Sequence, residues 1–137
     1  MRKKIILTAL LLMFIFSISA VANAAVLSSE YIREARANTT VNSQGTVNVS
    51  FRIIGTSIMD VIGAKTIIVQ EQAPGSSQWT AVATYSAENN SNMLKYNVAR
   101  MDSSISYSGA KSGYSYRAKV YFYAEKGGYD TVEYIAY

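Results

Sequence analysis

The segment "YSYRAKVYFYAE" (114–125) constrains this chain most, because apolar and polar residues alternate along its whole length. Its even-numbered positions are apolar or aromatic: Tyr114, Tyr116, Ala118, Val120, Phe122 and Ala124. Its odd-numbered positions carry charges and hydroxyl groups: Ser115, Arg117, Lys119, Tyr121, Tyr123 and Glu125. Since successive side chains of a β-strand point to opposite faces, this period of two predicts a long strand with one buried and one solvated face.

The same period recurs elsewhere in the chain. In "TVNVSFRII" (46–54), one face is predicted to hold the apolar residues Val47, Val49, Phe51 and Ile53. Further strands are predicted over 64–71, 79–85, 104–108 and 130–137. In the first of these, Ile67 and Val69 are expected to face inward. Two segments leave alternatives open, because 30–40 fits a helical turn or a strand, and 93–102 fits a short strand or irregular chain.

Turn-forming sequences separate the predicted strands. Glycine and polar residues occupy 73–78, 88–92, 109–113 and 125–130, and the adjacent glycines of the last segment favour a hairpin. The segment "GTSIMDVIGAK" (55–65) is unusually apolar for a connection. We interpret it as a loop that folds over one end of the domain and plugs its core. The alternative is an exposed apolar tip that a partner covers.

Short strands separated by polar turns, without a long helical pattern, predict an all-β fold. We expect a single antiparallel β-sandwich of about seven strands, in the size class of fibronectin type III and immunoglobulin domains. A small closed barrel is the alternative. Trp79 opens one predicted strand and is expected in the core or at its rim.

The first residues are predicted to form a signal peptide (1–24). Three basic residues at 2–4 precede an apolar run, and "ANA" (22–24) provides a cleavage site of small residues. The alternative is an uncleaved anchor, because the run is close to the minimum of about 17 residues for crossing a bilayer. Cleavage after Ala24 would leave one domain (25–137), secreted or extracellular and without a membrane anchor.

Composition narrows the classes of function. The net charge of +4 comes largely from the three basic residues of the predicted signal peptide, so no footprint for nucleic acid remains. The chain has no histidine and no cysteine, which removes the Ser-His-Asp and Cys-His types of catalysis and the commonest metal ligands. Glu125 and Asp130 flank the glycine hairpin, where a solvated turn explains both. We therefore expect a protein that is not an enzyme and that uses no cofactor and no metal.

The tyrosines of 114–125 divide between the two predicted faces. Gly113 and Tyr116 resemble the Gly-x-x-Tyr of fibronectin-like domains, in which a buried tyrosine at the start of a strand bonds the backbone upstream. Ser112 stands where proline is usual in that motif. The resemblance implies that Tyr116 is a determinant of the fold and not a ligand contact.

Tyr121, Tyr123, Arg117 and Lys119 share the other face, and they are the candidate contacts for a ligand or partner. Aromatic rings with basic neighbours suit stacking on a cell-surface glycan or on a protein. The alternative is that cross-strand aromatic pairs merely stabilise a solvated sheet. A second function class is a structural, self-assembling extracellular protein, since the last strand, "TVEYIAY", has no lysine or proline to prevent strand addition. The oligomeric state and the ligand stay open.

Several segments together resemble a known family. They are "GTSIMDVIGAKTIIVQE", "NMLKYN" and "YSGAKSGYSYRAKVYFYAEKGGYDT". In this order they are similar to a family of small secreted proteins of Gram-positive anaerobes that is described only as a domain of unknown function. The resemblance implies a signal peptide followed by one β-sandwich. It implies no established activity and no functional residues.

Overall fold

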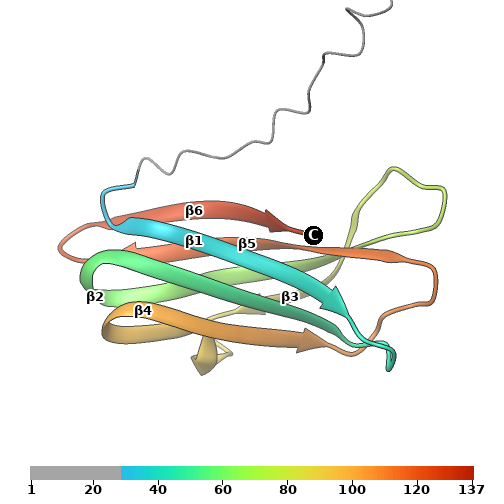
Figure 1. Cartoon of the computed structure of the whole chain (residues 1–137), viewed down its shortest axis with the longest axis horizontal. Helices are drawn as coiled ribbons and strands as arrows, with labels where there is room; N and C mark the ends of the chain where they lie inside the picture. Colours follow the sequence, from blue (N-terminus) through green and yellow to red (C-terminus); the bar gives the residue numbers. More distant parts are fainter. Residues whose placement is uncertain (1–28) are drawn as a thin grey trace, which may run out of the picture.

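The computed structural model describes residues 29–137, so the predicted signal peptide lies outside the described residues (Figure 1). Its strands are β1 (Ile32–Val41), β2 (Val47–Gln72), β3 (Thr80–Ser86), β4 (Leu94–Tyr107), β5 (Ser115–Glu125) and β6 (Tyr129–Ala136). A single turn of 3₁₀-helix, η1 (Ser91–Met93), precedes β4, and no α-helix occurs in this part of the chain. The prediction of an all-β, antiparallel fold is confirmed, with six strands in place of about seven.

The 26-residue strand β2 organises the sheet. Its first half pairs with β1 on one edge and β4 on the other, and its second half pairs with β5 and β3. β6 continues the sheet beyond β5. Figure 1 shows that the sheet curls, so that β1, the first half of β2 and β4 lie in front of the other strands. The core fills the space enclosed by the curl.

The interpretation of 55–65 as a plugging loop is wrong. This segment lies within β2, where the register with β4 shifts between Ile54 and Met59. Met59 and Ile62 are buried, and Ile58 is 61% exposed. The apolar residues therefore belong to a strand that passes from one side of the curl to the other. The two segments for which the sequence left alternatives, 30–40 and 93–102, are also largely strand.

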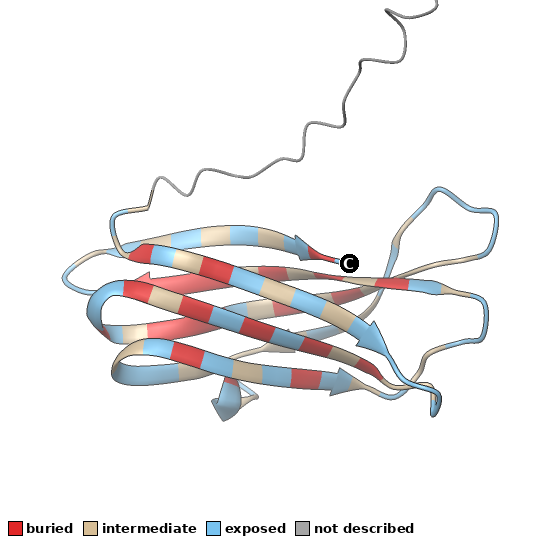
Figure 2. Cartoon of the chain, viewed as in Figure 1, coloured by how far each residue is buried: buried red, intermediate tan, exposed pale blue. Residues whose placement is uncertain are grey.

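The faces of the strands follow the alternation of the sequence. Figure 2 shows buried and exposed residues alternating along the front strands. The predicted inward residues of β2 and β5 are buried: Val47, Val49, Phe51, Ile53, Ile67, Val69, Tyr116, Ala118, Val120, Phe122 and Ala124. Phe51 and Phe122 meet edge to face in the core, with ring centroids 6.1 Å apart. This contact joins the two sides of the curl through the geometry that aromatic pairs prefer.

Two seams complete the curl. Along the first, β1 and β6 run in the same direction (Figure 1), and the Thr39 hydroxyl donates to the Ala136 carbonyl at 3.0 Å. At the other end of this seam, the Tyr31 N–H donates to the Asp130 carboxylate at 2.9 Å. Along the second seam, the Tyr85 hydroxyl of β3 donates to the Ser106 carbonyl of β4 at 2.9 Å. These side-chain bonds, together with a backbone bond of 3.4 Å from the Thr39 N–H to the Tyr137 carbonyl, thus join the edges of the sheet.

Candidate binding surface on the outer face of β5

The four predicted contact residues do lie along one face of β5, but their surroundings differ. Tyr121 is half-buried in the middle of the strand, opposite Glu133 of β6. Burial raises the pKa of the Tyr121 hydroxyl, and the neighbouring Glu133 carboxylate raises it further. Lys119 lies 3.8 Å from the same carboxylate. At the centre of the face, Tyr121 and Lys119 therefore both lie beside the Glu133 carboxylate.

Tyr123 is only 6% exposed, so the expectation that it forms part of an exposed row is wrong. The Lys65 ammonium lies 3.7 Å from the centroid of its ring, and Tyr129 stacks on the ring at 5.8 Å between centroids. Its hydroxyl donates to the Glu125 carboxylate. Burial and that carboxylate raise the pKa of Tyr123 to about 12. Neighbouring side chains cover this ring, and Tyr129 takes its place at the surface.

Arg117 is the centre of a second aromatic cluster. Its guanidinium carbon lies 4.4 Å from the centroid of the Trp79 ring and 5.7 Å from that of Tyr137. The guanidinium also donates to the Gln70 side-chain oxygen at 2.8 Å and to the Tyr137 hydroxyl at 3.1 Å. Trp79 and Tyr137 meet edge to face at 6.1 Å. We call Trp79, Arg117 and Tyr137 the arginine–aromatic cluster.

Trp79 was expected in the core or at its rim, but its contact with Arg117 was not predicted. It is half-buried against Arg117 and is absent from the group of side chains that form the core. Trp79 lies 38 residues from Arg117 in the chain, and no periodic pattern connects the two. A usable signal was the polar sequence "GSSQ" directly before Trp79, which places the ring at the end of an exposed turn.

The surface offers stacking and hydrogen bonding at its two ends. Tyr137 is 67% exposed beside a guanidinium that two side chains already orient. Tyr129 is exposed at the far end of β6, about 27 Å away by the rise of a strand. Exposed aromatic faces beside a cation favour ring-shaped or peptide ligands.

Tyr116 stands apart from this surface, as the resemblance implied. Its ring is buried, and its hydroxyl accepts a hydrogen bond of 2.8 Å from the Lys111 N–H, upstream in the chain. Gly113 has a φ of +79°, in the region that favours glycine. The corner geometry is thus present although Ser112 replaces proline.

Other chemistry is sparse in residues 29–137. No group of three or more His, Cys, Asp or Glu residues there could hold a metal ion. Glu125 and Asp130 serve separate partners, since Glu125 accepts from Tyr123 and Asp130 from Ser29. No helix in this range has the length and hydropathy to cross a membrane.

The fold and the surface define a small antiparallel β domain with an aromatic and basic outer face. No protein-family model matches the chain, and no curated protein matches it. The resemblance to secreted proteins of Gram-positive anaerobes stays a prediction.

Proposed function

We propose that this chain is a secreted, non-catalytic binding module of the fibronectin type III or immunoglobulin-like sandwich class, released by cleavage after Ala24. Its ligand is a cell-surface glycan, bound on the outer face of β5 by Arg117, Lys119 and Tyr121 together with Trp79 and Tyr137. Tyr123 lies beneath Lys65 and Tyr129 and makes no contact with the ligand. The arginine–aromatic cluster carries the proposal.

The cluster supports the proposal because it is organised before any ligand arrives. Gln70 and the Tyr137 hydroxyl hold the guanidinium, so a ligand meets a fixed cation between two rings. A site whose side chains are already oriented pays less conformational entropy on binding. The exposed Tyr137 ring can stack on a sugar, and guanidinium N–H groups can donate to its hydroxyl groups.

The test is binding of the chain 25–137 to a glycan array and to isolated cell walls. Trp79→Ala combined with Tyr137→Ala should weaken binding about tenfold, since each aromatic contact contributes about 0.5–1.5 kcal/mol. Tyr121→Ala should weaken it less. The matched control is Tyr96→Ala, which removes a ring that is 63% exposed on β4. Undiminished binding by the double variant would exclude this surface, and binding only to wall proteins would exclude a glycan.

A second candidate function is self-assembly through β3. Within residues 29–137, β3 pairs only with β2, and its sequence "TAVATYS" contains no charge and no proline. Such an edge can add a strand from a second molecule. The last strand was the original candidate, but the free edge of β6 lies beside β1 and bonds to Thr39. The β6 seam also has a backbone bond, from the Thr39 N–H to the Tyr137 carbonyl at 3.4 Å. The β3 edge is joined to β4 by the Tyr85 hydroxyl, and no backbone bond crosses that seam within residues 29–137. The backbone groups of β3 are therefore the more accessible for assembly.

Light scattering after size exclusion tests this candidate. Assembly through β3 predicts oligomers at high concentration that Thr84→Lys, a charge on the exposed side of this strand, abolishes. Thr131→Lys on β6 is the control and should leave the oligomers intact. A wild-type monomer at every concentration contradicts self-assembly.

A further inference from the structure

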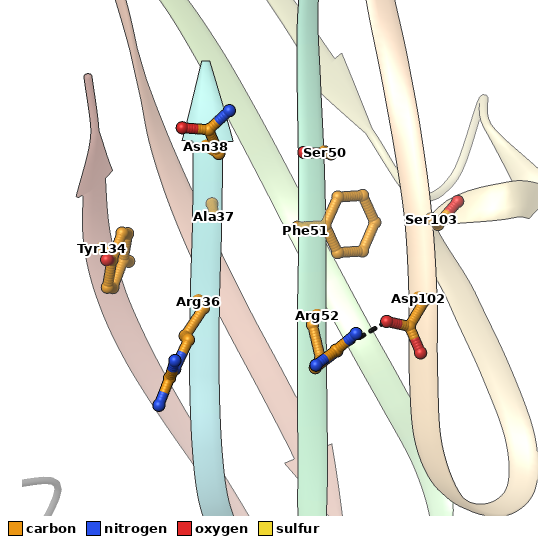
Figure 3. Close-up of a pocket in the computed structure, with 9 residues that line it drawn as sticks. All are labelled: Arg36, Ala37, Asn38, Ser50, Phe51, Arg52, Asp102, Ser103 and Tyr134. Carbon is orange, nitrogen blue, oxygen red and sulfur yellow. Dashed lines mark hydrogen bonds and ion pairs between the residues drawn. The ribbon is translucent and has the colours of Figure 1, made fainter. Parts of the chain in front are cut away.

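A hollow of about 380 Å³ lies on the side of the curl formed by β1, β2 and β4 (Figure 3). Its lining combines polar and apolar residues of four strands: Arg36, Ala37 and Asn38 of β1, Ser50, Phe51 and Arg52 of β2, Asp102 and Ser103 of β4, and Tyr134 of β6. None of these residues belongs to the outer face of β5. The volume is within the range of small-molecule sites, about 300–1,000 Å³.

Positive charge predominates around the hollow. The strand register places Arg36 opposite Arg52, and Arg52 opposite Asp102. Asp102 accepts hydrogen bonds from Arg52 at 2.7 Å and from Arg100 at 2.6 Å, so one carboxylate serves two guanidinium groups. Within residues 29–137, Arg36 forms an ion pair only with Glu34, at 3.2 Å. Three arginines thus face two carboxylates, which leaves one positive charge in excess.

Hydrogen-bonding groups lie directly beside these charges. Asn38 pairs with Ser50, and Ser50 pairs with Ser104, in the row of the sheet next to that of the arginines. The side chains of Asn38 and Ser50 make no hydrogen bond to the rest of the described chain. In Figure 3 the Asn38 amide lies above Arg36 on the same strand, while the Arg52 guanidinium points toward Asp102.

We propose that the hollow binds a sugar acid, a ligand that carries a carboxylate on a hydroxyl-bearing ring. The excess positive charge of Arg36 and Arg52 pairs with the ligand carboxylate through N–H groups not used by Glu34 and Asp102. Asn38 and Ser50 bond the ring hydroxyl groups. Neutral sugars lack the first interaction, and simple carboxylates lack the second.

Two-dimensional NMR titration of the chain 25–137 tests the proposal with three probes: D-glucuronate, D-glucose and acetate. D-glucuronate should bind at least tenfold more tightly than either other probe and should shift the amide signals of Ser50, Arg52 and Ser103. Arg36→Ala should weaken glucuronate binding about tenfold. Arg33→Ala, which removes an exposed arginine of the same strand outside the hollow, should leave it unchanged.

Arg52→Lys is a second variant that keeps the charge. It should weaken glucuronate binding while urea unfolding shows the fold intact, because lysine cannot donate two parallel hydrogen bonds to a carboxylate. Acetate binding as tightly as glucuronate would overturn a sugar acid in favour of simple anion binding. An absence of shifts with all three probes would overturn the proposal. Signal changes confined to Trp79 and Tyr137 would overturn the hollow as the site and would instead support sugar binding by the outer face of β5, so the failure of one proposal can be distinguished from the failure of the other.

Discussion

The Lys111 backbone N–H donates a hydrogen bond of 2.8 Å to the hydroxyl of Tyr116, which ties the connection after β4 to the start of β5. The same hydroxyl lies 3.3 Å from the Glu71 carboxylate of β2. Glu71 also pairs with the Lys111 ammonium, at 2.7 Å. One tyrosine hydroxyl therefore joins a loop, the strand that follows it and the central strand of the sheet.

Tyr116→Phe should lower the free energy of unfolding by about 1–2 kcal/mol, because the Lys111 N–H loses its acceptor in a partly buried place. Urea unfolding followed by circular dichroism measures the change. Tyr114→Phe is the control and should have little effect, since its hydroxyl makes no hydrogen bond within residues 29–137. Equal stability of Tyr116→Phe and the wild type would contradict a structural role for the hydroxyl.

Gly63→Ala should destabilise the chain by about 3 kcal/mol or more, since a β-carbon at this position would lie 2.1 Å from the Met93 carbonyl oxygen. Gly127→Ala is the control, because it introduces backbone strain without a steric clash. Gly127 has a φ of +72° and open space around it, so alanine there should cost only about 1–2 kcal/mol. Thermal unfolding of both variants checks the order. A smaller loss for Gly63→Ala than for Gly127→Ala would show that β2 and η1 separate readily.

Acid should weaken the fold partly through Asp102. Hydrogen bonds from Arg100, and then from Arg52, lower the pKa of this carboxyl from 3.8 to about 2. The folded chain therefore takes up the proton less readily than the unfolded chain, and the stabilisation present above pH 4 is lost as the pH falls toward 2. Because Asp102 is half-exposed, this contribution should stay below about 1 kcal/mol.

Urea unfolding between pH 2 and 5 measures the contribution of Asp102. Asp102→Asn should be less stable than the wild type at pH 5 and should lose less stability on acidification. Asp60→Asn, at an exposed carboxylate of β2, should retain the wild-type pH dependence. If the free energy of unfolding of Asp102→Asn depends on pH as steeply as that of the wild type, the ion pairs of Asp102 with Arg52 and Arg100 do not stabilise the fold.

Alkali should weaken the fold through Tyr123. Its pKa is raised from 10.0 to about 12, first by burial and then by Glu125. Stabilisation from the neutral hydroxyl is thus complete below pH 10 and is lost as the pH rises through 12. Tyr123→Phe should reduce the loss of stability between pH 10 and 12, measured by the change in melting temperature. If the melting temperature of Tyr123→Phe falls with rising pH as steeply as that of the wild type, the Tyr123 hydroxyl is accessible to solvent in the folded chain.

Asp130 should hold the start of β1 against β6. Its carboxylate accepts from the Ser29 hydroxyl at 2.6 Å and from the Tyr31 N–H at 2.9 Å, and these bonds lower its pKa. Asp130→Ala should speed hydrogen exchange at the Tyr31 and Ile32 amides at least tenfold. The Val120 amide in the core should exchange at the wild-type rate, as should all three amides in Thr131→Ala. Unchanged exchange at Tyr31 would show that the seam does not depend on Asp130.

The sequence by itself determined which faces of β2 and β5 are buried, because strand alternation is a local property that each short segment carries. The corner at Tyr116 was implied by the resemblance of Gly113 and Tyr116 to the Gly-x-x-Tyr of fibronectin-like domains, which also lies within one short segment. The apolar content of 55–65 was equally plain, but local pattern does not distinguish a plugging loop from the middle of a long strand.

Only the tertiary structure decided that 55–65 continues β2, because its pairing partners come from β4 and β5. Tyr123 illustrates the same limit. Alternation placed it on the outer face, but Lys65 and Tyr129 cover it after the strands pair. The arginine–aromatic cluster and the hollow beside Arg52 likewise join residues distant in the chain. Burial and site geometry depend on such long-range neighbours, which the alternation within one strand cannot specify.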